Sequence, residues 1–521
     1  MPTALVYALL SGVLLVLSFP TVGHPALSWV ALVPLVVATG RAPSAFVAWR
    51  LGLVTGLVHF GGMIYWIPAV MVTFGGLPTA VAWLVHAVLV GYLALFPSLF
   101  ALALWTVGQR LGAHAMLWTP VFWVTSELGR LHLFTGFPWE LLGYSQAAVL
   151  PVAQLASVTG VLGLSALVAL VNGSLAFAAV AVGRRRWFPL AVTLGVVAVG
   201  VGVGMARLAA SDLLRSGTAT RVAAVQGNTL QDEKWDPELA QRNLRRYLDL
   251  TEMAADAGAS LVVWPEASTP FVFESDRRAE QIRALARERQ VHLLFGTTDV
   301  APRSPLRPSE PAGYYNAVVM LDRQGETAGV YRKQHLVPWG EYVPLSDLLF
   351  FVSPLVQNVG GFSAGDRATT LPFDGAAVGT AICYEIIYPG LVRELAVEGS
   401  HLLTTVTNDA WFGRTAAPYQ HLQMASLRAI EQGRFLVRAA NTGISAVIDP
   451  YGRVLDRSPL FEEALIVADV RLLEHATIFA RTGDLTALTC GSLSALLLTF
   501  SLRRRPWRVT TRSAAQMSKL S

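Results

Sequence analysis

The chain has 521 residues, of which 53% are apolar and only 14% are charged, and its mean hydropathy is +0.48. Soluble proteins contain roughly 25% charged residues, so these values exclude a single water-soluble globule. The net charge of +5 does not indicate nucleic-acid binding, because the basic excess lies in arginine clusters beside apolar runs, a pattern typical of membrane topology.

The distribution of charge divides the chain into distinct parts. Residues 1–207 contain ten charged residues and residues 484–521 contain seven, whereas the 276 residues between them contain 58, which is a normal density for a soluble domain. We therefore expect an N-terminal transmembrane domain over 1–210, a soluble domain over 217–475, a C-terminal transmembrane helix over 484–502 and a basic cytoplasmic tail over 503–521.

Long stretches without Asp, Glu, Lys or Arg predict the membrane-spanning helices. A helix needs about 20 apolar residues to cross the bilayer core. The first run has no basic region before it, so it does not resemble a cleaved signal peptide. Eight helices are predicted, seven before the soluble domain and one after it, at about 4–20, 25–40, 47–68, 79–107, 114–130, 158–182, 187–207 and 484–502.

Basic residues in the short loops predict the orientation. With the N-terminus in the cytoplasm, the inner loops and the tail contain twelve basic residues, and the outer short loops contain one, Arg130. Basic residues accumulate on the cytoplasmic side of membrane proteins. Seven spans then place the soluble domain outside the cytoplasm, on the same side as the Gly/Pro/aromatic segment 134–140. We expect this segment to be either an interfacial aromatic belt or a lipid-facing gate beneath the soluble domain.

The soluble part alternates short β-branched runs with polar helical stretches, which predicts an α/β layered domain. Three expected strands are followed by Glu266, Lys333 and Cys383. Ligands collect outside the carboxyl ends of strands in α/β sheets, so these side chains are predicted to form one site. The expected strands are 221–226, 260–264, 291–296, 317–321, 328–331, 376–382, 402–406 and 444–448, and the expected helices are 237–257, 275–289, 389–399 and 418–433.

A glutamate, a lysine and a cysteine together suit acyl transfer through a thioester. Cysteine attacks as a thiolate, and a nearby cation such as the Lys333 ammonium lowers the pKa of the thiol. The same ammonium, with a backbone amide after Cys383, would stabilise the oxyanion of a tetrahedral intermediate. Glu266 would take the thiol proton and later return one to the leaving group. A Cys–His pair is the alternative arrangement, using His335, His401 or His421.

Three motifs around these residues resemble those of the nitrilase, or carbon-nitrogen hydrolase, superfamily. They are Trp264-Pro265-Glu266, the segment Tyr331 to Glu341, and Ile382-Cys383-Tyr384-Glu385. The eight spans, with Gly136-Phe137-Pro138-Trp139 and the segment Asn408 to Gly413, are similar to the apolipoprotein N-acyltransferase family in particular. The resemblance implies a polytopic α-helical membrane domain and a four-layer αββα sandwich, with the sandwich on the periplasmic face of a bacterial inner (cytoplasmic) membrane.

The resemblance also implies roles for individual residues. It makes Glu266 the general base, Lys333 the stabilising cation and Cys383 the nucleophile. The implied reaction moves the sn-1 acyl chain of a phospholipid to the cysteine, and then to the α-amino group of the diacylglyceryl-cysteine of an apolipoprotein, in the last step of bacterial lipoprotein maturation. Further positions that the family uses around the site or near the lipid entrance are Trp235, Glu341, Tyr384, Glu385 and Trp411.

Residues 343–356 are too apolar for an ordinary surface loop. They are expected to form either a buried helix of the sandwich or a lid that dips into the bilayer interface. Gly360, Gly361 and Gly365 follow this segment and would supply a hinge, because glycine tolerates backbone angles that other residues avoid.

No cofactor is expected. The histidines are scattered, and neither a phosphate-binding loop nor an interleaved basic and aromatic pattern occurs, so no metal, nucleotide or nucleic acid is predicted. Cys383 and Cys490 are expected to remain thiols. Two other functions share parts of the pattern. A membrane-tethered nitrilase-type amidase would have little use for eight spans, and an inactive polytopic scaffold or transporter would be favoured by intramembrane charges, of which the spans are almost free.

Overall fold

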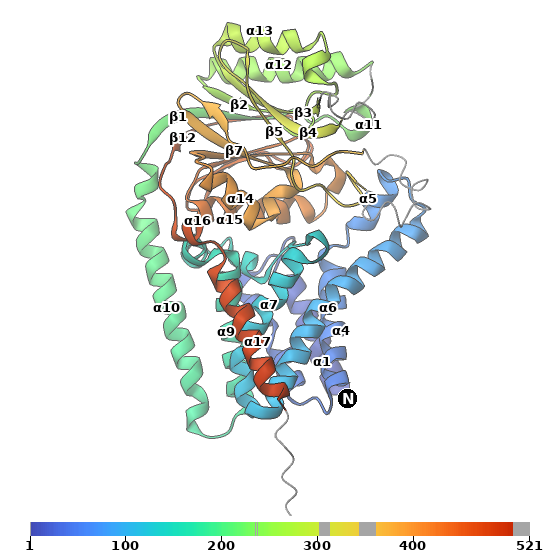
Figure 1. Ribbon diagram of the computed structural model, residues 1–521, viewed down its shortest axis with the longest axis vertical. Helices are drawn as coiled ribbons and strands as arrows, with labels where there is room; N and C mark the ends of the chain where they lie inside the picture. The colour runs from blue at the N-terminus through green and yellow to red at the C-terminus, as the bar shows by residue number, and fades with distance from the viewer. Residues whose placement is uncertain (1, 235, 237, 302–312, 343–360, 504–521) are drawn as a thin grey trace, which may run out of the picture.

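The computed structural model describes residues 2–234, 236, 238–301, 313–342 and 361–503. Trp235, Gly360 and the segment 343–356, for which the sequence predicts roles near the lipid entrance, lie outside these residues. A bundle of apolar helices lies at one end of the molecule, and a layered α/β domain lies at the other (Figure 1).

Apolar helices occur at the positions of the predicted spans. Five helical stretches of the described residues are long and apolar enough to cross a membrane, and Pro2–Leu17 and Pro25–Gly40 are shorter apolar helices. The helices of the bundle are α1 (Pro2–Leu17), α2 (Pro25–Ala31), α3 (Val33–Gly40), α4 (Ala45–Met63), α5 (Ile67–Thr73), α6 (Thr79–Leu111), α7 (Thr119–His132), α8 (Leu150–Ala153), α9 (Ala156–Val180), α10 (Trp187–Ala210) and α17 (Leu485–Leu502).

Two of the predicted spans differ in detail from the structure. The span expected over 25–40 is divided at Leu32, where α3 begins with Pro34 in its first turn, because proline is tolerated there but not inside a helix. The span expected over 114–130 begins later, at Thr119 of α7, because the chain turns at Gly112, whose φ is 56°, and forms the 3-10 helix Gly112–Trp118; α7 then packs against α6.

Twelve strands of the described residues form two six-stranded sheets that pack against each other. The first sheet has the order β12-β1-β2-β3-β4-β5 and contains β1 (Thr218–Gln226), β2 (Leu261–Val263), β3 (His292–Val300), β4 (Tyr314–Leu321), β5 (Thr327–Arg332) and β12 (Ala464–Leu472). The second has the order β11-β10-β9-β8-β7-β6 and contains β6 (Leu371–Phe373), β7 (Ala376–Ile382), β8 (Leu402–Thr407), β9 (Leu436–Ala440), β10 (Ala446–Ile448) and β11 (Val454–Arg457).

Helices cover the outer faces of both sheets. On α12, the buried residues Leu244, Tyr247, Leu248 and Thr251 recur at the i, i+3, i+4, i+7 spacing of one helix face, which explains why this helix packs on the sheet. The four layers confirm the expected αββα sandwich, and Figure 1 shows α14 and α15 between the second sheet and the membrane helices. The helices are α11 (Gln231–Lys234), α12 (Ala240–Asp256), α13 (Ala279–Arg289), α14 (Pro389–Val397), α15 (Ala417–Gln432) and α16 (Ile478–Thr482).

The sandwich is joined to the bundle by both apolar and polar contacts. One hydrophobic cluster extends from the membrane helices into α15 and the second sheet. Trp139 of the bundle donates a hydrogen bond from Nε1 to Gln420 Oε1 at 2.7 Å, and the Val161 amide donates to Glu431 Oε1 at 2.8 Å. These contacts hold the second sheet, and the residues at its strand ends, close to the membrane helices.

Candidate active site

The carboxyl ends of four strands meet at one end of the sandwich. Glu266 follows β2 and Lys333 follows β5 in the first sheet, whereas Cys383 follows β7 and Asn408 follows β8 in the second. The strands β7 and β8 are parallel neighbours, so the residues that follow them lie side by side. The side chains of the predicted triad are buried, with exposed fractions of 7% for Glu266, 1% for Lys333 and 8% for Cys383.

Two carboxylates hold the lysine between them. Lys333 Nζ lies 3.4 Å from Glu266 Oε1 and 3.0 Å from Glu341 Oε1. Asn316 donates from Nδ2 to the same two oxygens, at 2.7 Å in each case. The backbone amide of Val337 donates to Glu341 Oε2 at 2.8 Å. The ammonium and the amide group therefore keep two like-charged carboxylates close together.

The charges of this network decide the protonation of its members. Burial alone would raise the pKa of Glu266, but the charge of Lys333 and the hydrogen bond from Asn316 outweigh it and hold the pKa of this carboxyl below its usual value. Burial alone would lower the pKa of Lys333, but the charges of Glu341 and Glu266 raise it above its usual value. The site therefore contains an ionised general base and a permanent cation at neutral pH.

The Cys383 thiol lies near the Glu266 carboxylate and the Lys333 ammonium, and the charges of both act on its pKa. Burial raises the pKa of this thiol, the charge of Glu266 raises it further, and the charge of Lys333 opposes both. The expectation that Lys333 would lower the thiol pKa is therefore wrong in its net direction, because burial and the carboxylate outweigh the cation. At neutral pH the site therefore holds a thiol and a carboxylate.

Two further residues hold Glu266 in place by hydrogen bonds. The Asn408 amide donates to Glu266 Oε2 at 3.0 Å, and Lys234 donates from Nζ to the Glu266 carbonyl oxygen at 2.9 Å. Burial lowers the pKa of Lys234 to about 8. Sequence reasoning did not assign Lys234, Asn316 or Asn408 to the site. Asparagine is uncommon in strands, so its occurrence in β4 was a usable signal for Asn316.

Glu385 ties the lysine segment to the cysteine segment. Its carboxylate accepts hydrogen bonds from Tyr331 Oη at 3.0 Å and from the backbone amides of Gln334 and Ile382 at 2.7 Å each. Burial raises the pKa of Glu385 to about 7. Because it has these partners on both sheets, Glu385 positions the strand ends instead of facing the thiol. Tyr384 is buried, and its ring lies 5.3 Å, centroid to centroid, from that of Tyr388.

The three alternative histidines make their contacts with groups other than the Cys383 sulfur. His421 Nε2 lies 3.2 Å from the carbonyl oxygen of Cys383. His401 precedes β8 and therefore lies at the opposite end of that strand. The His335 ring lies 3.9 Å, centroid to centroid, from that of Tyr388. Among the residues that the structure describes, no histidine is hydrogen-bonded to the Cys383 sulfur, which favours the Glu–Lys arrangement over a Cys–His pair.

Segment 134–140 of the bundle lies at the edge of this site. Tyr388 donates from its hydroxyl to the Gly136 carbonyl oxygen at 3.0 Å. Trp139 is only 2% exposed, so it is not part of an interfacial aromatic belt. Trp411 is 37% exposed, and its ring lies 5.0 Å from that of Phe74 in α5. The structure thus places Trp411 at the junction with the bundle and outside the carboxylate–lysine network.

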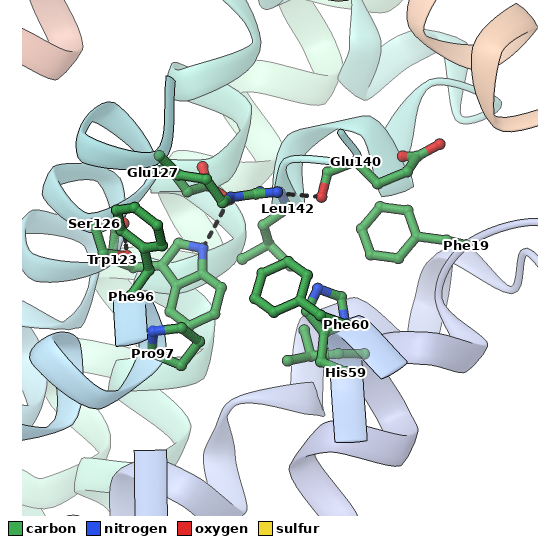
Figure 2. A pocket seen from close by; sticks show the side chains of 12 residues that line it. Phe19, His59, Phe60, Phe96, Pro97, Trp123, Ser126, Glu127, Glu140 and Leu142 are labelled. Atoms are coloured by element: carbon green, nitrogen blue, oxygen red, sulfur yellow. Dashed lines mark hydrogen bonds between the residues drawn. The ribbon is translucent and has the colours of Figure 1, made fainter. Parts of the chain in front are cut away.

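Buried polar groups hold this segment in place from below. Figure 2 shows a pocket of the membrane helices in which Trp123 and Glu127 lie close together, with a hydrogen bond of 3.0 Å from Trp123 Nε1 to Glu127 Oε1. Arg130, which also lines this pocket, donates to the carbonyl oxygens of Trp139 at 2.7 Å and Glu140 at 3.3 Å. These buried charges therefore stabilise the backbone beneath the site. Of the described residues, no group of three or more His, Cys, Asp or Glu is placed to hold a metal ion.

Known proteins are similar to this chain over nearly its whole length. The family model of the apolipoprotein N-acyltransferase N-terminal domain matches residues 11–174, and that of carbon-nitrogen hydrolase matches residues 221–476. The apolipoprotein N-acyltransferase of Geobacter metallireducens is 41% identical, and the similarity covers 96% of this chain and 95% of that protein. The apolipoprotein N-acyltransferase of Methylococcus capsulatus is 35% identical, with 96% of this chain and 97% of that protein covered.

Among solved structures, an amidase from Nesterenkonia sp. is 24% identical, covers 50% of this chain and 94% of its own, and has a TM-score of 0.37. The matches to the acyltransferases extend through both the membrane helices and the sandwich, and the relatives correspond to this chain from end to end. The chain therefore belongs to the apolipoprotein N-acyltransferase family.

Proposed function

We propose that this enzyme acylates the N-terminal diacylglyceryl-cysteine of apolipoproteins with a chain taken from a phospholipid, by way of a thioester on Cys383. The chain is an acyltransferase of lipoprotein maturation, because it belongs to the apolipoprotein N-acyltransferase family. The observation that carries the thioester route is the buried Cys383 thiol near the Glu266 carboxylate, which itself lies 3.4 Å from Lys333 Nζ.

In the first half-reaction, the Cys383 sulfur attacks the carbonyl carbon of the phospholipid ester while its proton passes to Glu266. The carbonyl oxygen becomes an oxyanion, which the Lys333 ammonium and the backbone N–H of Tyr384 stabilise. The intermediate collapses by breaking the ester C–O bond. The departing lysophospholipid oxygen takes the proton from Glu266, and the acyl chain stays on the sulfur as a thioester.

In the second half-reaction, the α-amino group of the diacylglyceryl-cysteine attacks the thioester carbonyl carbon. Glu266 takes a proton from the attacking nitrogen, and the same donors stabilise the second oxyanion. The C–S bond then breaks, the sulfur recovers a proton from Glu266, and an amide is released. Water has to be kept out during this exchange, and the burial of Glu266, Lys333 and Cys383 is consistent with that requirement.

If the active site lies on the outer side of the membrane, both lipid substrates can reach it from that side. The protein is a multi-pass inner-membrane protein, and the arginine distribution supports a periplasmic sandwich with both chain ends in the cytoplasm. Fusions of green fluorescent protein and of alkaline phosphatase after residue 521 test this orientation. We expect a fluorescent first fusion and an inactive second fusion, and the reverse pattern would contradict the orientation.

A transfer assay tests the function itself. The purified enzyme is incubated with a phospholipid that carries an isotope label only in its sn-1 chain, together with a synthetic diacylglyceryl lipopeptide. We expect the label on the peptide nitrogen, in an alkali-stable amide, and no transfer by a Cys383→Ala variant. Release of the label solely as free fatty acid would identify a hydrolase and contradict the proposal. An acetylated lipopeptide, which has no free amine, is the matched control acceptor.

A further inference from the structure

His421 contacts the backbone of the nucleophile, not its sulfur. This residue lies on α15, is fully buried, and places Nε2 at 3.2 Å from the carbonyl oxygen of Cys383. A carbonyl oxygen only accepts hydrogen bonds, so Nε2 carries the hydrogen and donates it. The other ring nitrogen, Nδ1, lies 3.1 Å from Arg438 Nη2, which can only donate. Hydrogen on Nε2 satisfies the contact with Cys383, whereas Nδ1 lies within hydrogen-bond distance of both Arg438 Nη2 and Asp409 Oδ1.

A buried ion pair holds the imidazole in this orientation. Arg438 Nη2 lies 2.6 Å from Asp409 Oδ2, and both side chains are fully buried. The other oxygen, Asp409 Oδ1, lies 3.1 Å from His421 Nδ1 and accepts a hydrogen bond from Thr407 Oγ1 at 2.9 Å. Burial and the positive charge of Arg438 lower the pKa of His421, and the charge of Asp409 partly opposes them. Asp409, Arg438 and His421 thus form a polar network that ends at the peptide group between Cys383 and Tyr384.

That peptide group carries a catalytic donor on its other edge. The carbonyl of Cys383 and the N–H of Tyr384 belong to one planar peptide, so a group that fixes the carbonyl also fixes the direction of the N–H. The backbone of Cys383 has a φ of 52°, in the left-handed region, which persists in a non-glycine residue only where the surroundings impose it. A hydrogen bond to the carbonyl also polarises the peptide and makes its N–H a stronger donor.

We infer that His421, held by Asp409 and Arg438, is a positioning residue that aims the Tyr384 N–H at the oxyanion of the acyl intermediate. This inference rests on the proposed function, because it concerns the oxyanion of both half-reactions. The bundle also reaches this residue: the Trp139 ring lies 5.9 Å from the His421 ring, centroid to centroid. The membrane segment beneath the site therefore packs directly on the group that orients the oxyanion donor.

Two reactions of the same sulfur separate this role from a merely structural one. Acylation by phospholipid passes through an oxyanion, whereas alkylation by iodoacetamide displaces iodide and forms none. Both rates are measured by intact mass in the full-length enzyme with the background substitution Cys490→Ser, so that Cys383 is the single thiol. The variants are His421→Leu, which has no donor, and His421→Gln, whose side-chain amide can reach the carbonyl from the Nε2 side.

We expect His421→Leu to slow acylation about 100-fold, a loss typical of one oxyanion donor, while alkylation stays within about twofold of the parent. We expect His421→Gln to recover most of the acylation rate. Equal losses in both reactions, unchanged acylation, or a His421→Gln variant no better than His421→Leu would each overturn the inference. Should His421→Leu not fold, His421→Asn replaces it: its shorter amide donates from the Nδ1 side, and acylation as fast as in His421→Gln would refute the role.

The thioester route and the role of His421 can be refuted independently of each other. If the parent enzyme is never acylated by phospholipid although iodoacetamide alkylates Cys383, the thioester route is wrong. If the parent is acylated and His421→Leu is acylated at the parent rate, the thioester route stands and the role of His421 is wrong.

Discussion

Asn316 offers a direct test of how the site keeps its general base ionised. Its side-chain amide donates to Glu266 Oε1 and to Glu341 Oε1 at 2.7 Å each, and it is only 8% exposed. Asn316→Leu keeps the branched shape and the number of side-chain heavy atoms but removes both hydrogen bonds. A hydrogen bond to a charged group contributes about 1.5–3 kcal/mol, and it favours the ionised form of the carboxylate that accepts it. The substitution should therefore raise the pKa of Glu266.

The sign of the pH effect follows from the role of the carboxylate. Glu266 accepts the thiol proton only when it is ionised, so acylation is fast above its pKa and slows as the pH falls through it. In Asn316→Leu the acid limb of the profile should move to higher pH. On that limb the rate is proportional to the ionised fraction, so the loss of about 1.5–3 kcal/mol corresponds to a rate about 10- to 100-fold lower. The plateau at alkaline pH should change little.

The assay is the rate of acyl-enzyme formation from phospholipid, measured by rapid quenching and intact mass across the pH range. Asn172→Leu is the matched control, because Asn172 is also a buried asparagine with side-chain hydrogen bonds but lies on α9 in the membrane bundle. A variant whose plateau falls while its acid limb stays in place would refute the reasoning. Asn316 would then act on the geometry of the site and not on the charge of Glu266.

Two further predictions concern the cation and the junction with the bundle. Lys333→Arg should lower the acylation rate at least 100-fold although it keeps the charge, because the wider guanidinium does not fit where Nζ lies between two carboxylates. A near-normal rate in a folded variant would contradict this. Trp139→Phe leaves buried Gln420 Oε1 without its indole donor and should lower the free energy of unfolding by about 1–3 kcal/mol. The control Trp187→Phe, at a 52% exposed position of α10, should change it by less than about 0.5 kcal/mol, and equal effects would argue against the hydrogen bond.

The local patterns of the sequence predict most of the fold. Charge-free apolar runs predict the membrane helices, and β-branched runs predict eight of the strands. The strands β6, β9, β11 and β12 were not predicted. Arg438 interrupts the apolar pattern of β9, and its charge is accommodated by a buried carboxylate that is distant in sequence. The strand β11 is exposed along its whole length, and Pro372 lies within the short strand β6, so neither shows a buried alternation.

The candidate site is only partly predictable for a related reason. Glu266, Lys333 and Cys383 each follow a predicted strand, so the strand pattern of the sequence identifies them as candidates for one site. Asparagine within strand β4 was a usable signal for Asn316. Asn408 and His421 make contacts between distant parts of the chain, and no local pattern reports those. The direction of the thiol pKa was also inaccessible, because Lys333 and Glu266 act on Cys383 with opposite sign, and burial, which no local pattern quantifies, outweighs the lysine.

The most direct test of the central claim is the intact mass of the purified enzyme after incubation with phospholipid. A thioester on Cys383 predicts a gain of one fatty acyl group, which is lost when a diacylglyceryl lipopeptide is added and then appears on the peptide nitrogen. Cys490→Ser should gain the same mass, because that thiol lies in α17, whereas Cys383→Ser should not accumulate a thioester that the peptide can discharge. Transfer to the peptide by a Cys383→Ser variant, or an adduct on the parent enzyme that the peptide does not remove, would contradict the account.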